Sequence, residues 1–182
     1  FTSTQQRFLR AREPTGEWKT ILPRQPNHEY AADHRAGKFY VRTNKDALNF
    51  RVVTCPVGDT DPKNWTDLLA HDPDVYVEGL TLFHDYAVVS ERQDANAQLR
   101  VIDLKTGLPH RVELPEPVSD VNVGVNPEFD STSLRIGYSS PVTPPTEYEY
   151  DMATGACKLL KRTEVPGGFD PSAYQVERTF AP

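Results

Sequence analysis

Apolar and polar residues alternate along most of the chain, and helical spacing is almost absent. In the stretches 39–44 and 99–104, neighbouring residues switch between apolar and polar in the way that buries one face of a sheet. Only 64–70 has a capping residue, Asn64, followed by apolar residues at helical spacing, and that stretch fits one helical turn as well as it fits a strand. The pattern therefore predicts an all-β fold.

The expected strands fall into four groups, of which the first is incomplete. They are 2–9 and 18–22; then 29–34, 39–43, 50–55 and 65–71; then 77–83, 86–91, 99–104 and 110–114; and finally 121–125, 134–139, 148–152 and 157–161.

One hairpin occurs twice and sets the period of the chain. Residues 99–114 and 147–160 each read as strand, Asp-x-x-Thr-Gly, strand, with Gly107 and Gly155 at the same point of the turn, about 48 residues apart. A weaker copy at 8–21 carries Gly16, about two further periods upstream. A β unit that recurs at this interval is typical of propeller blades. We therefore expect a β-propeller fragment of about three and a half four-stranded antiparallel blades.

The repeat pattern stops after Glu164, which divides the chain into two parts. Residues 1–164 are expected to form the blades, and 165–182 a linker with the first strand of another domain. The stretch 165–174 is dense in Pro and Gly, and such a segment is typical of a crossing between domains. The last residues, 174–181, resemble a new strand with no partner in this chain.

Composition excludes two classes of partner. The 182 residues carry a formal net charge of −6 and a pI of about 5.4, without the basic stripe of a nucleic-acid-binding protein. No apolar run is long enough to span a membrane, and the N-terminus does not resemble a signal peptide. Cys55 and Cys157 make no CxxC motif, so we expect reduced thiols in a cytoplasmic protein.

No catalytic, metal or cofactor motif is present in the sequence. There is no G-x-S-x-G nucleophile elbow, no HExxH or HxH spacing among the five histidines, and no Gly-rich phosphate loop after a strand. The numerous aromatic residues suit core packing between blades better than a groove for peptide or glycan. Pattern and composition thus predict a fold without an activity.

Short motifs along the whole chain carry a family resemblance. The longest is the run EYAADHRAGKFYVRTNKDALNFRV at 29–52. The others are VEG at 77–79, ER at 91–92, LRV at 99–101, EFD at 128–130, YSSP at 138–141, YDM at 150–152, TG at 154–155 and EVPGGFD at 164–170. In this order, the motifs resemble the propeller domain of the oligopeptidase B group of the prolyl oligopeptidase family of serine peptidases.

The resemblance implies a seven-bladed propeller above an α/β-hydrolase domain that cleaves short peptides after Lys or Arg. The catalytic Ser, Asp and His of the family lie in the hydrolase domain, so no catalytic residue is assigned here, and no cofactor or metal is expected. The expected partners are that hydrolase domain and an oligopeptide substrate. The propeller is expected to exclude folded proteins from the active site. The linker residues form a candidate hinge, namely Val165, Pro166, Gly167, Gly168, Phe169 and Asp170.

Other interpretations stay open at this point. A free-standing propeller-like module that binds peptides or proteins would show the same repeats, because propellers carry many functions. A glycan-binding propeller is less consistent, since no aromatic residue repeats at equivalent blade positions. Uncovered faces of an incomplete ring also predict self-association through the exposed blades.

Overall fold

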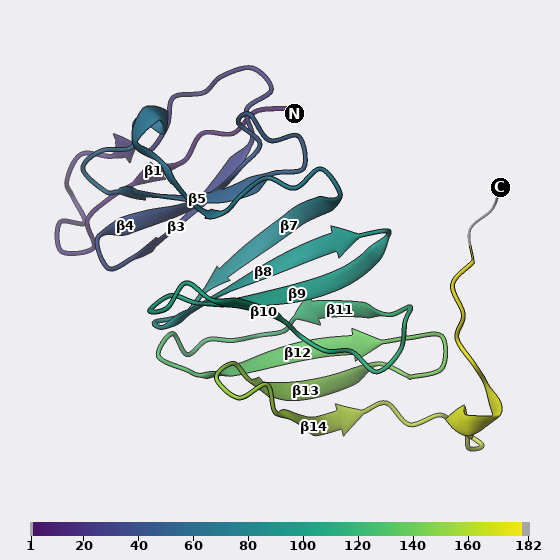
Figure 1. The fold of residues 1–182 in the computed structure, drawn as a ribbon. Coiled ribbons are helices and arrows are strands. Elements are labelled where there is room, and N and C mark those ends of the chain that lie inside the picture. The colour runs from purple at the N-terminus through teal and green to yellow at the C-terminus, as the bar shows by residue number, and fades with distance from the viewer. Residues whose placement is uncertain (1, 180–182) are drawn as a thin grey trace. The chain divides into compact units, whose positions relative to one another are not determined.

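The computed structural model describes residues 2–179 and consists almost entirely of antiparallel strands (Figure 1). Its helical elements are two short 3-10 turns, η1 (Pro62–Asn64) and η2 (Pro171–Ala173). No helix within these residues is long and apolar enough to cross a membrane. The chain divides into two compact units, the first ending at Val77 and the second starting at Glu78.

The first unit contains one two-stranded and one four-stranded sheet. β1 (Arg7–Phe8) pairs with β2 (Lys19–Thr20). The larger sheet has the order β3-β4-β5-β6, with β3 at Tyr30–Arg35, β4 at Lys38–Thr43, β5 at Arg51–Pro56 and β6 at Thr66–Leu69. Phe39, Val41, Val53 and Cys55 alternate along β4 and β5 and form the centre of a buried cluster.

The second unit contains two four-stranded sheets. The first has the order β7-β8-β9-β10, with β7 at Val75–Leu82, β8 at Tyr86–Gln93, β9 at Asn96–Asp103 and β10 at Pro109–Arg111; β7 thus begins in the last residues of the first unit. The second has the order β11-β12-β13-β14, with β11 at Asp120–Val123, β12 at Ser133–Ser139, β13 at Thr146–Asp151 and β14 at Cys157–Arg162.

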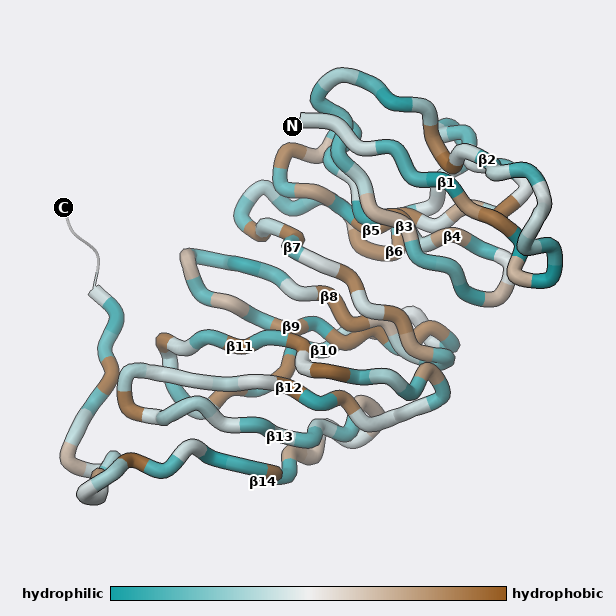
Figure 2. The backbone as a smooth tube through the Cα atoms, turned by 180° about the vertical axis from the view of Figure 1, so that it is seen from behind, coloured by the Kyte–Doolittle hydropathy of each residue, from teal (hydrophilic) through white to brown (hydrophobic). Residues whose placement is uncertain are grey.

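One hydrophobic core joins the two sheets of the second unit. Hydrophobic stretches of β8 and β9 contribute to this core (Figure 2). Its buried residues come from both sheets and from the loops that follow β7, β10 and β13: Phe83, Tyr86, Val88, Ala97, Leu99, Val101, Val112, Val121, Leu134, Ile136, Tyr138, Tyr150 and Met152. Sheets that bury one face against each other in this way are stacked blades, and the expected all-β fragment of about three and a half blades is confirmed.

The repeated hairpin has the same turn in both copies. The Oδ1 atoms of Asp103 and Asp151 each accept hydrogen bonds from the backbone N–H groups two and three positions later, at 2.7 and 3.0 Å and at 2.9 and 2.7 Å. The N–H groups of Gly107 and Gly155 donate to the carbonyl oxygens of the same aspartates at 2.8 Å, with φ of 75° and 76°. The Asp-x-x-Thr-Gly motif is therefore a single turn design that needs glycine for its left-handed residue.

Some expectations from the sequence differ from the structure. The upstream copy is a hairpin, but Gly16 has no positive φ and donates to the Glu13 carbonyl, so its turn is of another kind. The stretch 64–70 is mostly strand β6, and the helical turn lies before it because Pro62 and Lys63 follow the capping carboxylate of Asp61. Trp18 and Phe129 are exposed rather than part of a core.

The expected N-terminal strand is shorter than predicted, and the strand expected at the C-terminus pairs with no described strand. Only Arg7–Phe8 of 2–9 pairs with another strand. Residues 174–179 of the strand expected at 174–181 are irregular, because no described neighbour offers them a strand edge, and 180–181 lie outside the described residues.

The face of the β11–β14 sheet that points away from its core is polar. Arg135, Glu149 and Lys158 are register partners across three strands, and Glu147 is the register partner of Lys161. Cross-strand pairs of opposite charge suit a hydrated face. The prediction of self-association through blade faces stays untested, and on this face it would have to use polar contacts.

Candidate functional site

The candidate site is one end of the second unit, from which the chain leaves the sheets. We call it the exit end, and it consists of the β8–β9 turn (94–95), the β10–β11 loop (112–119), the β12–β13 loop (140–145) and the exit segment (163–179). The repeated Asp-x-x-Thr-Gly turns lie at the opposite end (Figure 1). Loops carried by a rigid sheet are the usual location of function in such folds.

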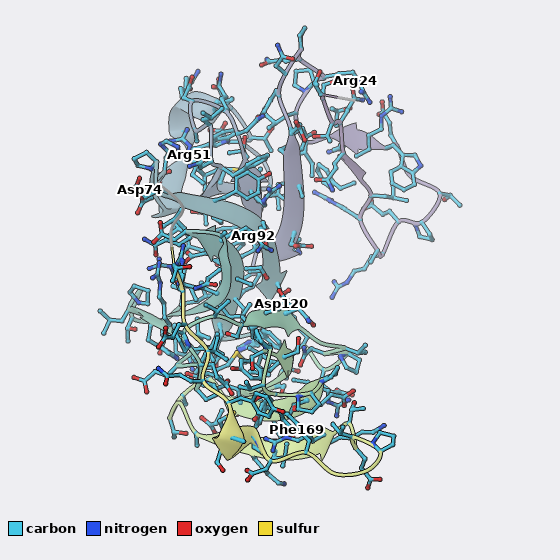
Figure 3. All side chains as sticks on the ribbon, turned by 90° about the vertical axis from the view of Figure 1, so that its right-hand side faces the viewer. Arg24, Arg51, Asp74, Arg92, Asp120 and Phe169 are labelled. Atoms are coloured by element: carbon cyan, nitrogen blue, oxygen red, sulfur yellow. The ribbon has the colours of Figure 1, made fainter. Side chains whose placement is uncertain are left out.

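Hydrogen bonds connect these four parts. The Asn96 side chain, next to the β8–β9 turn, donates to the Pro117 carbonyl oxygen at 2.8 Å. The Thr163 N–H donates to the Pro145 carbonyl oxygen at 2.9 Å, where the exit segment begins. The exit segment then runs past the ends of the sheets, as seen from this end in Figure 3, and Arg178 donates to the carbonyl oxygen of Asp94. The exit end is thus a connected surface.

A single carboxylate holds two of the loops together. Glu116, in the β10–β11 loop, accepts a hydrogen bond from the Thr143 hydroxyl at 2.5 Å and another from the hydroxyl of Tyr138. Ser140 shapes the same β12–β13 loop, since its Oγ accepts from the N–H groups of Val142 and Thr143 at 3.1 and 2.9 Å. These bonds fix the loops before any partner arrives.

A buried ion pair lies next to the exit end on the β7–β10 sheet. The Glu91 carboxylate is fully buried and binds the Arg100 guanidinium in a bidentate way, at 2.5 and 3.0 Å. Arg111 on β10 reaches the same carboxylate at 3.5 Å. The pair therefore ties β8, β9 and β10 together close to the β8–β9 turn.

The candidate hinge residues form a tight turn followed by a capped 3-10 turn. Gly167 and Gly168 have φ of 88° and 84°, with no neighbour close to the position of an added Cβ. Asp170 caps η2, and hydrogen bonds from the hydroxyl and N–H of Ser172 lower the pKa of its carboxyl. Phe169 stacks on Tyr174 with ring centroids 5.3 Å apart. The stretch expected as linker is thus locally ordered on both sides of two flexible glycines.

A pocket of about 400 Å³ lies between the β12–β13 loop and the exit segment. Its apolar lining comes from Val142, Pro144, Val165, Phe169 and Pro171, and its charged lining from Arg162 and Glu164. Within residues 2–179 no group of three or more His, Cys, Asp or Glu side chains could hold a metal ion. The side chains of the exit end can therefore contact a partner and position it.

The histidines have structural partners. Nε2 of His28 lies 2.9 Å from the Thr43 hydroxyl, and burial, with the nearby charge of Lys45, lowers the pKa of this histidine. Nε2 of His110 lies 3.1 Å from the hydroxyl of Tyr150. His28 is buried in the first unit, whereas His110 lies on the exposed strand β10.

Sequence reasoning located the exit segment but missed most of the contacts at this end. The resemblance includes Glu91 and Arg100 without indicating that they form a buried pair. No local pattern marks Glu116, because its two partners lie 22 and 27 residues away.

Comparison with known proteins gives a consistent result over the whole chain. The family description "Prolyl oligopeptidase, N-terminal beta-propeller domain" matches residues 2–163. The dipeptidyl aminopeptidase BI of Pseudoxanthomonas mexicana is 40% identical over 181 residues, which cover 99% of this chain and 25% of that protein. Protease 2 of Moraxella lacunata is 23% identical and is covered to 26%. The chain thus spans about a quarter of the length of these relatives.

Solved structures show the same fold. Oligopeptidase B from Trypanosoma brucei, in a closed form with covalently bound antipain, matches 94% of this chain with a TM-score of 0.86 and 25% identity, over 26% of its own length. Oligopeptidase B from Leishmania major matches 98% of this chain with a TM-score of 0.82 and 26% identity, also over 26% of its length. The chain therefore belongs to the prolyl oligopeptidase family, as part of its N-terminal β-propeller domain.

Proposed function

We propose that this chain is the part of a peptidase propeller that controls the access of oligopeptides to a serine-type catalytic domain of the same protein. The chain itself contributes no catalytic residue. The match of residues 2–163 to the propeller domain of a peptidase family supports this proposal. The exit end, with its ordered loops and pocket, is the surface that we expect to face the α/β-hydrolase domain.

The proposed cleavage is after Lys or Arg in short peptides. Support comes from the motifs shared with oligopeptidase B and from the two oligopeptidase B structures with TM-scores of 0.86 and 0.82. A propeller that excludes folded proteins also removes water from the catalytic site when it closes, which strengthens electrostatic contacts with the substrate.

A second candidate is the release of dipeptides from the N-terminus of a peptide. It is supported by the 40% identity with a protein named dipeptidyl aminopeptidase BI. The two candidates share a fold and a reaction and differ in whether the substrate needs a free amino terminus.

Fluorogenic peptides can separate these two candidates. The intact protein that contains this chain is incubated with an N-blocked peptide ending in Arg or Lys before the fluorophore, with a free dipeptide before the same fluorophore, and with norleucine analogues as controls. Hydrolysis of the blocked Arg and Lys peptides supports the first candidate, and hydrolysis limited to free dipeptides supports the second. A serine-directed inhibitor must abolish either activity; turnover that survives it contradicts both.

The filtering role has a separate test. The same scissile bond is placed in peptides of increasing length and in a folded protein. We expect kcat/KM to fall steeply for the longest peptides and to vanish for the folded protein. Equal rates for peptide and folded protein would contradict a filter.

We also propose a cytoplasmic location and an activity that needs no cofactor. Cys55 and Cys157 are free thiols, which supports a reducing compartment. Fractionation of cells that express the intact protein would test the location.

A further inference from the structure

The β8–β9 turn has an unusual backbone for its sequence. Asp94 and Ala95 connect the register partners Gln93 and Asn96, so they form a two-residue hairpin loop. Both have positive φ, 50° and 64°. Such turns normally use Asn-Gly or Asp-Gly, because alanine is disfavoured in the left-handed region. The turn therefore keeps a strained residue at the edge of the exit end.

Each carbonyl oxygen of this turn accepts a hydrogen bond from a guanidinium. Nη1 of Arg92 donates to the Ala95 carbonyl oxygen at 3.1 Å. Arg178, from the exit segment, donates to the Asp94 carbonyl oxygen across a separation of 84 residues. The left-handed conformation turns both carbonyl groups outward, where cationic donors can reach them.

Arg92, which binds the turn, is itself held by an ion pair with the neighbouring strand β7. Nε of Arg92 donates to the Glu78 carboxylate at 2.7 Å. This bond, the charge of Glu78 and the charge of Asp120 raise the pKa of Arg92. Figure 3 labels Arg92 and Asp120 on neighbouring sheets of the second unit. The β8–β9 turn is thus attached to the sheet through Arg92, which binds the Ala95 carbonyl oxygen and leaves the Asp94 carbonyl oxygen to Arg178.

The exit segment is attached at its start and near its end. The Thr163 N–H binds the β12–β13 loop, and Arg178 binds the β8–β9 turn of the other sheet. Gly167 and Gly168, with positive φ and no close neighbour, lie between these two attachments. Rotation at the glycines has to break the contact of Arg178.

We propose that the Asp94–Ala95 turn is a docking point for Arg178 that fastens the exit segment across both sheets of the second unit. The consequence of this docking rests on the proposed function. In that function, release of Arg178 is the step that frees the propeller to move against the catalytic domain. Arg178 is a positioning residue, since its proposed effect acts through the segment that it fastens.

Distance measurements between spin labels test the docking without substrate. In the intact protein, Cys157→Ser removes the exposed thiol, and nitroxides are attached at Gln175→Cys in the exit segment and Glu149→Cys on β13. We expect one narrow distance population. Arg178→Gln should lower that population about tenfold relative to open forms, which corresponds to about 1.4 kcal/mol. Arg178→Lys, which keeps the charge, should restore it in part.

Matched controls separate docking from a general effect of charge or folding. Lys105→Gln removes a cation at the opposite end of the second unit and should leave the narrow population unchanged. On the turn, Ala95→Gly accepts the left-handed conformation and should keep the population, whereas Ala95→Val should lose it. A narrow population that persists in Arg178→Gln overturns the proposal. The cleavage assay is independent: absence of Lys or Arg cleavage with normal docking would reject only the proposed function.

Discussion

The Glu91 carboxylate has no exposed surface and accepts hydrogen bonds from Nε and Nη2 of Arg100, at 2.5 and 3.0 Å. The two residues lie on adjacent strands, β8 and β9, in the sheet that ends at the docking turn. A buried carboxylate depends on its partner, because an unpaired charge in the interior loses its hydration without compensation.

Removal of one partner of this pair should be strongly destabilising. We expect Arg100→Ala to lower the free energy of unfolding by about 3–5 kcal/mol, since it leaves Glu91 with only the more distant Arg111. Replacement of both residues by Met should cost less, because it leaves no buried charge. Urea denaturation followed by circular dichroism measures each change. Glu149→Ala, on the polar face, is the control, and an equally large loss there would contradict the explanation.

The two repeated turns predict that the stability of the fold depends on pH in the same way at Asp103 and at Asp151. Hydrogen bonds from the backbone N–H of Thr106, then of Lys105, lower the pKa of Asp103, and those from Thr154 and Ala153 lower the pKa of Asp151. Folding therefore favours the ionised carboxylates. Their contribution is present above the ordinary aspartate pKa of about 3.9 and is lost as the pH falls through the lowered folded pKa.

Substitution at these aspartates should reveal that dependence. Asp103→Ala should be less stable than the unchanged protein at pH 7, and the difference should shrink toward zero in acid. Asp103→Asn keeps an acceptor without a charge, so its stability should vary less with pH in the acid range. Thermal melts between pH 7 and pH 2.5 provide the comparison, and Asp151 should repeat each result. A difference that stays constant with pH would exclude the carboxylate charge as its source.

Period and turn chemistry were enough to predict most of the fold. The Asp-x-x-Thr-Gly motif specifies its own hydrogen bonds, so Gly107 and Gly155 fix two hairpins from local sequence alone. Alternation predicts the buried residues of β9 as far as Val101, whereas Tyr40 in β4 and Ile102 in β9 are buried as well, outside the alternation. The strand expected after Tyr174 stays a prediction, because a strand needs a neighbouring edge and the described residues contain none that pairs with this stretch.

The contacts at the exit end were not predictable in the same way. Glu116 meets Tyr138 and Thr143 only because two loops, each ordinary in sequence, are brought together by sheet packing. Arg178 and Asp94 lie 84 residues apart, and the accepting group is a backbone carbonyl that exists in any sequence. Only the glycines at 167–168 carried a local signal, and they indicate conformational freedom without naming a partner.

The Glu116 contacts predict energetic coupling between the β10–β11 loop and the β12–β13 loop. Tyr138→Phe and Thr143→Val each remove one hydroxyl donor to the same carboxylate, and each should lower the free energy of unfolding by about 1–3 kcal/mol. Because the donors share an acceptor, the double variant should depart from the sum of the single effects by at least about 0.5 kcal/mol. Chemical denaturation of the unchanged protein, the two single variants and the double variant gives the double-mutant cycle. Ser139→Ala serves as the control for loss of a nearby hydroxyl, and additive effects would show that the two bonds act separately.

The hinge proposal makes a prediction about rates. Gly167 and Gly168 have φ of 88° and 84°, where alanine costs roughly 1–2 kcal/mol per residue, so Gly167→Ala with Gly168→Ala should restrict the turn. In the intact enzyme we expect slower opening of the propeller against the catalytic domain and a lower kcat, with stopped-flow fluorescence transfer between the two domains as the measurement. Gly58→Ala is the matched control, since Gly58 also has no close neighbour but does not require a positive φ. If opening rates and kcat are unchanged in the double variant, the segment is a passive linker, and movement of the domains must depend on another part of the chain.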